Sequence, residues 1–345
     1  MDLGLIMEPR PIIMPEHPRC VYIEVTNTCN LLCQTCPITF MDLEAREVLS
    51  YDKFLTIVGQ FPRIERAVLH GIGEPLLNKA LPQMISYLKQ HRGSHVLFNS
   101  NATLLKPDWQ RDLIVAQLDE LRVSLDAATP ETYRKIRGAP AFDKIVENLR
   151  GMVATKAALG STLPKLSLWC TGMKENIAEL PDLVRLAARL GIGEVYLQRL
   201  VFYDAGHTIG LAREDQSLYG LSEKYAEEVI AECERLSQDL GVRLEASGAT
   251  NPRTSLAKDQ ADPAPWRACQ RPWTVTYVTV NGNILPCCIA PFATSDYQSI
   301  VLGNLFARPF DEIWNGERYQ EFRTGLQSLH APSDACAKCG AKWSL

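Results

Sequence analysis

The sequence predicts an α/β fold: a partial (β/α)6 TIM-like barrel followed by a small C-terminal region with a β-hairpin and a helix. Six apolar runs of strand length alternate with longer amphipathic stretches, the pattern of parallel βα units. The segment WTVTYVTV-NG-NILPCC predicts the hairpin, because Asn281 and Gly282 can adopt the positive φ angles of a tight primed turn. In such a barrel the reactive groups lie on loops that follow the strand C-termini.

The expected elements follow one another along the chain. The strands are 21–26, 66–71, 94–100, 121–126, 165–171 and 194–200. The helices are YDKFLTIVGQF, LPQMISYLKQH, the stretch 106–117, FDKIVENLRGMVATKAAL, NIAELPDLVRLAARLG and, after a loop at 203–220, SEKYAEEVIAECERLSQDLG. A polar, proline-containing stretch then predicts a boundary, and a short helix is expected near 309–327. We therefore expect a lead-in at 1–18, the barrel at 19–245, a linker at 246–266 and a C-terminal domain at 267–345.

The composition is that of an ordinary soluble globular protein. The 345 residues are 46% hydrophobic and 22% charged, with a formal net charge of −4, which gives no reason to expect nucleic acid or an anionic membrane as a partner. No apolar run is long enough to span a bilayer, and the first residues lack the features of a secretory signal. The sequence therefore predicts a cytoplasmic protein.

Eleven cysteines are many for a protein in a reducing compartment, where clustered thiols more often bind metal than form disulfides. Cys29, Cys33 and Cys36 lie close together on the loop after the first expected strand. Three thiolates leave one iron of a [4Fe–4S] cluster without a protein ligand, and such an open position can chelate a substrate or cofactor. A three-cysteine zinc site with a distant fourth ligand, and chance clustering, are the alternatives.

The spacing Cys29-x3-Cys33-x2-Cys36 at this place resembles the signature of the radical S-adenosylmethionine (SAM) superfamily. Three later segments resemble, in order, SAM-binding elements of that family: HGIGEPLL at 70–77, FNSNATLL at 98–105 and VSLDAATPETYRKIRG at 123–138. The resemblance implies that SAM binds the open iron and is cleaved by one electron to a 5′-deoxyadenosyl radical, which abstracts hydrogen from a substrate. It also implies a low-potential electron donor such as flavodoxin or ferredoxin.

The resemblance assigns residues of these segments to the SAM site: Gly73, Glu74, Ser100, Asn101, Ser124, Asp126 and Arg137. The first two correspond to the element that receives the SAM amino group, and the last two to supporting positions. Thr35 and Ala102 depart from the family, which usually has an aromatic residue and a glycine there. Four of the assigned residues also have ordinary structural interpretations: a surface turn for Glu74, a turn for Asn101, a helix cap for Asp126 and a surface charge for Arg137.

Five further cysteines surround the expected hairpin: Cys269, Cys287, Cys288, Cys336 and Cys339. The hairpin brings Cys269 and Cys287 together, and the C-x2-C pair near the end is a ligand spacing of zinc and iron–sulfur sites alike. After such a barrel this tail resembles the SPASM/twitch extensions, which Gly282-x4-Cys287 fits. The resemblance implies one auxiliary [4Fe–4S] cluster of the twitch type, acting as an electron carrier. Its expected ligands are Cys269, Cys287, Cys336 and Cys339, with Cys288 as the alternative to Cys287.

Cys170 lies at the end of the fifth expected strand. It is a candidate hydrogen-atom donor to a substrate radical, as in radical SAM epimerases, or else a buried core residue. Other polar residues at strand ends are candidates for the substrate pocket: His70, Trp169, Lys174, Gln198, Arg199, Tyr203 and Asp204. This mixture suits a small hydroxylated molecule.

Three functions remain open from the sequence. The first is a radical SAM enzyme acting on a carbohydrate, aminocyclitol or nucleoside by dehydrogenation, epimerisation or decarboxylation. The second is a peptide-modifying maturase, against which we note that only about 20 residues precede the first strand, too few for an N-terminal peptide-binding domain. The third is a zinc-bound structural or interaction protein.

Overall fold

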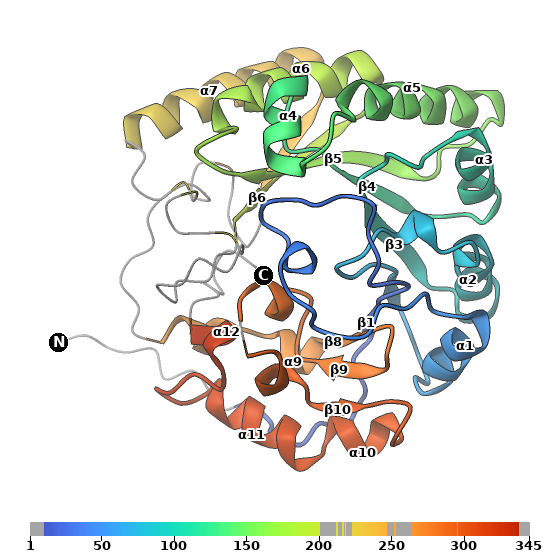
Figure 1. Cartoon of the computed structure of the whole chain (residues 1–345), viewed down its shortest axis with the longest axis vertical. Coiled ribbons are helices and arrows are strands. Elements are labelled where there is room, and N and C mark those ends of the chain that lie inside the picture. The colour runs from blue at the N-terminus through green and yellow to red at the C-terminus, as the bar shows by residue number, and fades with distance from the viewer. Residues whose placement is uncertain are drawn as a thin grey trace.

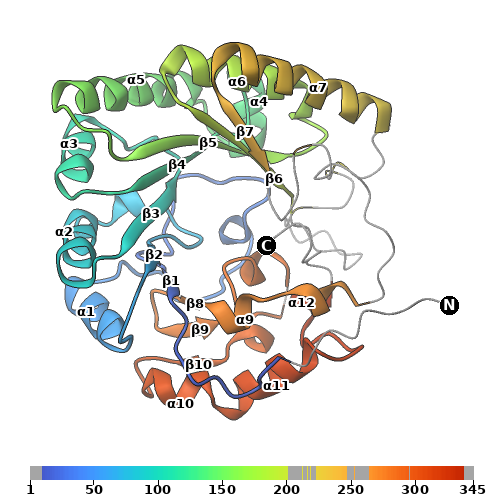
Figure 2. The ribbon, with the colours of Figure 1, turned by 180° about the vertical axis from the view of Figure 1, so that it is seen from behind.

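In the computed structural model of the chain, ten strands form one sheet that curls into an open barrel (Figure 1). The structure describes residues 10–200, 212, 216, 218, 223–246, 252, 264–294 and 296–337. The strand order is β10-β9-β8-β1-β2-β3-β4-β5-β6-β7, so β10 and β7 are the edges in this part of the chain. Figure 2 shows from behind that the N-terminal strands and the C-terminal elements lie side by side.

Seven parallel strands follow chain order: β1 (Cys20–Ile23), β2 (Arg66–Val68), β3 (His95–Ser100), β4 (Glu120–Ser124), β5 (Lys165–Gly172), β6 (Glu194–Arg199) and β7 (Arg243–Ala246). The first six confirm the predicted strands, and four of them end earlier than expected. Strand β7 was not predicted, because its four residues, RLEA, are too few and too polar to stand out in the sequence. This strand exists because its backbone pairs with β6.

Helices follow these strands: α1 (Tyr51–Gly59), α2 (Leu81–Tyr87), α3 (Pro107–Val115), α4 (Pro130–Arg137), α5 (Phe142–Ala158), α6 (Leu180–Leu190) and α7 (Glu223–Leu240). Only α4 was absent from the predicted set, although its ends carry clear signals. The hydroxyl of Thr129 accepts a hydrogen bond from the backbone N–H of Thr132, and Gly138, at φ 71°, ends the helix.

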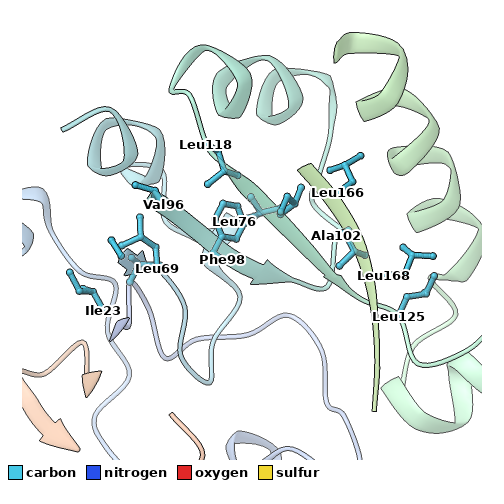
Figure 3. Close-up of a cluster of buried hydrophobic side chains, with 14 of the residues drawn as sticks. Ile23, Leu69, Leu76, Val96, Phe98, Ala102, Leu118, Leu125, Leu166 and Leu168 are labelled. Carbon is cyan, nitrogen blue, oxygen red and sulfur yellow. The ribbon is translucent and has the colours of Figure 1, made fainter. Parts of the chain in front are cut away.

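The main core lies between the sheet and the helices outside it. Figure 3 shows side chains of this core, among them Ile23, Val96, Phe98 and Leu168 from strands β1, β3 and β5, and Leu69, which directly follows β2. Fully burying an aliphatic or aromatic side chain contributes roughly 1.5–3 kcal/mol. This packing fixes the strand ends, and therefore the loops that carry polar residues.

The C-terminal hairpin extends the barrel sheet and does not form a sheet of its own. Strand β8 (Val275–Val278) pairs in parallel with β1 and antiparallel with β9 (Asn283–Leu285), which also pairs with β10 (Gly303–Asn304). The hairpin was predicted correctly, but the prediction of a tight primed turn was wrong. Gly282 alone has a positive φ, 84°, and its N–H donates to the carbonyl of Thr279, so the loop 280–282 is a three-residue turn.

The single helix expected near 309–327 is two helices, α10 (Phe310–Trp314) and α11 (Glu317–Gly325). They are separated at Gly316, where an added Cβ would lie 2.6 Å from the carbonyl oxygen of Glu312. The short helices α9 (Arg271–Thr274) and α12 (Asp334–Ala337) flank this region in sequence. Most of the predicted linker 246–266 and of the predicted loop 203–220 lies outside the described residues. Among the helices that are described, none is long and apolar enough to cross a membrane.

Candidate active site

A cavity of about 260 Å³ opens at the C-terminal ends of the barrel strands. In Figure 1 the long loop between β1 and α1 lies across the centre of this end of the barrel. The cavity is lined by every residue that the sequence assigned to the first cluster and to SAM: Cys29, Cys33, Cys36, Gly73, Glu74, Ser100, Asn101, Ser124, Asp126 and Arg137. The strand-end segments that resemble one family in sequence therefore form one site in space.

Nitrogen atoms of polar side chains approach the sulfur atoms of the first cysteine loop. Arg137 Nη1 lies 3.8 Å from Cys33 Sγ, and Asn101 Nδ2 lies 4.0 Å from Cys29 Sγ. Burial raises the pKa of the Cys29 thiol to about 11 and that of the Cys36 thiol to about 12, so metal binding must displace their protons.

The donor set suits a [4Fe–4S] cluster, whose thiolate ligands are spread over several irons. Within the described ranges, no group of three His, Cys, Asp or Glu side chains that could hold a single metal ion is found. Three thiols on one loop, with N–H donors near two of the sulfurs, suit that cluster and leave one position open for SAM.

Glu74 lines the cavity and connects the loop after β2 to the end of β3 through hydrogen bonds. It is 2% exposed, so the surface-turn interpretation is wrong. Its carboxylate accepts hydrogen bonds from Ser100 Oγ at 2.7 Å and from the Asn101 N–H at 2.8 Å. Burial raises the pKa of this carboxyl. Beside it, Gly73 has no room for a side chain, because an added Cβ would lie 2.2 Å from the carbonyl oxygen of Thr26.

Asp126 and Arg137 form a buried ion pair, with 2.6 Å between Oδ2 and Nη2. Asp126 also accepts a hydrogen bond from the Thr171 N–H at 2.8 Å, which ties the loop after β4 to β5. The helix-cap interpretation of Asp126 is wrong, since Thr129 caps α4. The surface-charge interpretation of Arg137 is wrong as well. The same guanidinium approaches Cys33, so this pair supports the cysteine loop.

Cys170 does not line the cavity. It is 3% exposed in the main core, and its Sγ lies 3.6 Å from Asn176 Nδ2. Side chains alternate along β5, and its neighbour Thr171 is the residue that lines the cavity. The position of Cys170 therefore favours the core interpretation over that of a hydrogen-atom donor.

We expect Cys170→Ala to leave 5′-deoxyadenosine formation from SAM within about twofold of the unchanged protein. It should lower the free energy of unfolding by roughly 1 kcal/mol, because a small buried side chain loses packing. Anaerobic assay of the product by chromatography, with thermal unfolding in parallel, checks both numbers. A loss of substrate conversion with normal SAM cleavage would restore Cys170 as the donor.

The structure brings three of the predicted pocket residues to the cavity: His70, Gln198 and Arg199. Trp169 instead stacks on Tyr196, with 3.9 Å between ring centroids, and Lys174 is exposed. Tyr203 and Asp204 lie outside the described residues. The sequence analysis missed four lining residues that come from the C-terminal region: Tyr277, Cys288, Ile289 and Phe292. No local signal marks them, since they reach the cavity only because β8 pairs with β1.

Glu24, which the sequence analysis also missed, is a buried carboxylate that links three segments. It follows β1 and is 2% exposed. Its oxygens accept hydrogen bonds from the Ile72 N–H at 3.0 Å, the Tyr277 hydroxyl at 2.9 Å and the Val280 N–H at 3.2 Å. Burial raises its pKa to about 7, despite these hydrogen bonds, and the nearby Glu44 carboxylate acts in the same direction.

This pKa predicts how stability depends on pH. The unfolded carboxyl ionises near its ordinary value of 4.5 and the folded one near 7, so the folded state binds more protons between these values. Stability should therefore fall as pH rises through this window, by on the order of 3 kcal/mol, and then level off. Thermal unfolding followed from about pH 5 to about pH 8 checks the slope. Glu24→Gln should flatten it, whereas the exposed Glu16→Gln should not.

A second, apolar cavity holds the auxiliary cysteines. Cys269, Cys287 and Cys336 line it together, while Cys339 lies outside the described residues. Cys288 is absent from the lining of this cavity and lines the first one instead. The arrangement favours Cys287 over Cys288 as the auxiliary ligand. Burial raises the pKa of the Cys269 thiol, and three thiols in an apolar pocket fit an iron–sulfur cluster.

Two family profiles match this chain. The family profile of the radical SAM superfamily matches residues 23–187, and that of the SPASM iron–sulfur cluster-binding domain matches residues 269–340. A tungsten-containing aldehyde ferredoxin oxidoreductase cofactor-modifying protein of Pyrococcus furiosus is 26% identical over 344 residues, covering 93% of this chain and 87% of its own. An Fe-coproporphyrin III synthase of Methanosarcina barkeri is 25% identical over 332 residues, covering 92% and 79%.

Among solved structures, SuiB of Streptococcus suis has a similar fold. Its structure bound to S-adenosylmethionine gives a TM-score of 0.64 at 14% identity, covering 91% of this chain and 68% of SuiB. Its structure bound to the precursor peptide SuiA gives the same TM-score at 13% identity, covering 95% and 71%. At this identity the likeness concerns the fold alone.

Proposed function

Because the chain belongs to the radical SAM superfamily and carries a C-terminal SPASM-type iron–sulfur domain, we propose that it oxidises a small hydroxylated substrate at a C–H bond. A [4Fe–4S] cluster held by Cys29, Cys33 and Cys36 would supply the electron that cleaves SAM to a 5′-deoxyadenosyl radical. The side chains around it hold the loop, orient SAM and bind the substrate. Dehydrogenation, with the auxiliary cluster as electron acceptor, is the outcome we propose.

The observation that carries this proposal is the placement of two consecutive residues. Cys287 lines the auxiliary cavity and Cys288 lines the first cavity, so the two sites meet across one peptide bond. A substrate that has lost a hydrogen atom must still lose one electron and one proton to become a dehydrogenated product. The adjacent auxiliary site offers a place for that electron. A redox-neutral epimerisation needs a hydrogen-atom donor instead. Cys170 lies in the core, so Cys288, which lines the first cavity, is the thiol that would have to serve as that donor.

The cavity wall supports a polar substrate. Gln198 and Arg199 at the end of β6 line it, as do Thr171 and His70. Burial lowers the pKa of His70 to about 3, so its imidazole is neutral, and its Nδ1 accepts a hydrogen bond from the Asn99 N–H at 3.2 Å. Amide, hydroxyl, neutral imidazole and one guanidinium suit the hydroxyl groups of a carbohydrate, aminocyclitol or nucleoside. A flavodoxin or ferredoxin is the proposed reductant.

Peptide modification is the second candidate function. The fold likeness to SuiB, a protein solved with its precursor peptide, extends over almost the whole chain and favours it. The two candidates differ in the substrate but share the first cluster, SAM and the auxiliary site.

A labelled-substrate experiment tests the proposal. Anaerobically reconstituted protein receives SAM, dithionite and deuterated polyols, aminocyclitols, nucleosides or short peptides. We expect deuterium in 5′-deoxyadenosine from a hydroxylated small molecule, and a product that has lost one deuterium and one hydrogen. Deuterium transfer from a peptide alone would contradict the substrate class. An epimerised product in which one hydrogen has replaced one deuterium, with no other change in mass, would contradict the oxidative outcome.

The auxiliary cysteines offer a matched variant for the same assay. Cys336→Ala should keep deuterium transfer to 5′-deoxyadenosine while oxidised product falls at least about tenfold, a change of 1.4 kcal/mol in barrier height. Product formation at the unchanged rate in this variant would show that the electron does not pass to the auxiliary cluster.

A further inference from the structure

Arg271 lies between the two cysteine-lined cavities. It begins α9 and lines the auxiliary cavity together with Cys269 and Cys287. Its Nη1 also donates a hydrogen bond to Cys288 Sγ, at 3.4 Å, and Cys288 lines the first cavity. One guanidinium therefore reaches from the auxiliary thiols to the wall of the SAM site.

The positive charge of Arg271 does not depend on its surroundings. Arginine is protonated at any working pH. Arg271 is therefore a fixed cation against the auxiliary cysteines, whatever the pH of the experiment.

A fixed cation changes the redox behaviour of an iron–sulfur cluster. Reduction adds one negative charge to a cluster that is already anionic, and a nearby positive charge in an apolar pocket stabilises the reduced state. We propose that Arg271 raises the reduction potential of the auxiliary cluster, so that this cluster accepts an electron from the neighbouring cavity. Arg271 is a tuning and positioning residue in this role, since it acts through the cluster and not on the substrate. The role needs no particular substrate.

The test is the midpoint potential of the auxiliary cluster in the reconstituted full chain. Alanine at Cys29, Cys33 and Cys36 removes the first cluster, so that one signal remains for titration by electron paramagnetic resonance. Arg271→Met and Arg271→Gln remove the charge in two different shapes, and Arg271→Lys keeps it. Arg267→Gln is the matched control, because Arg267 lies in the same segment but is exposed.

We expect both uncharged variants to be at least tenfold harder to reduce, a shift of about 59 mV to lower potential for one electron. Arg271→Lys and Arg267→Gln should stay close to the parent protein. An unchanged potential in both uncharged variants would overturn the proposal. An equal shift in Arg267→Gln would also overturn it, because the shift would then follow from the loss of one positive charge anywhere in the segment and not from the position of Arg271. Loss of auxiliary iron from both uncharged variants, with retention in Arg271→Lys, would make Arg271 a structural residue and would also overturn it.

Discussion

Replacing Cys33 by alanine is expected to abolish 5′-deoxyadenosine formation and to remove one of two clusters. Cys33 is one of three thiols on the first loop, and two thiolates do not hold a [4Fe–4S] cluster that normally takes four ligands. Iron per chain should fall from about eight to about four, because each cluster contributes four. Iron and sulfide analysis, Mössbauer spectra and the SAM cleavage assay measure the change.

Cys233→Ala is the matched control for this variant. Cys233 is fully buried in α7, away from both cavities, so its loss should leave the iron content and SAM cleavage unchanged. If Cys33→Ala keeps all its iron and still cleaves SAM, the first loop does not carry the cluster. Loss of all iron from Cys33→Ala would contradict the independence of the two sites.

Replacing Asp126 by alanine is expected to lower the free energy of unfolding by about 3–5 kcal/mol, the usual cost of leaving one partner of a buried ion pair alone. Arg137 would lose its partner at 2.6 Å, and the Thr171 N–H would lose its acceptor. SAM binding should weaken by at least about tenfold, or 1.4 kcal/mol, since Asp126 and Arg137 line the cavity and Arg137 approaches Cys33. Chemical denaturation of the reconstituted protein and equilibrium dialysis with SAM give the two values.

The double variant Asp126→Ala/Arg137→Met distinguishes the cost of an unpaired buried charge from the cost of losing the packing of the two side chains. Removing the unpaired cation should restore part of the stability lost in Asp126→Ala, because no buried charge then lacks a partner. It should not restore SAM binding. A loss of stability below about 1 kcal/mol in Asp126→Ala would show that the pair is solvated and unimportant.

The parts of the site that lie on local segments could be predicted from the sequence. The cysteine spacing, GIGEP and VSLD each occupy a few consecutive residues at the end of a strand, and parallel strands bring such ends to one edge. Ala102 departs from the glycine that the family resemblance led us to expect. Its φ is 55°, a conformation that glycine adopts freely, so the structure gives a physical reason for expecting glycine at this position.

The parts that depend on long-range pairing could not be predicted. Tyr277 and Cys288 reach the cavity because β8 pairs with β1. These strands are far apart in the sequence: Tyr277 in β8 is 253 residues from Glu24, which follows β1. The orientation of Cys170 is a separate case. Its place near the end of β5 was right, but alternation along the strand turns its side chain to the core and that of Thr171 to the cavity.

The most direct test of the whole account is 5′-deoxyadenosine formation by the unchanged protein. The anaerobically reconstituted chain receives SAM and dithionite, and its metal content is measured in the same sample. The account predicts iron and sulfide in two [4Fe–4S] clusters and SAM-dependent release of 5′-deoxyadenosine. Stable zinc in place of iron, with no 5′-deoxyadenosine, would contradict it.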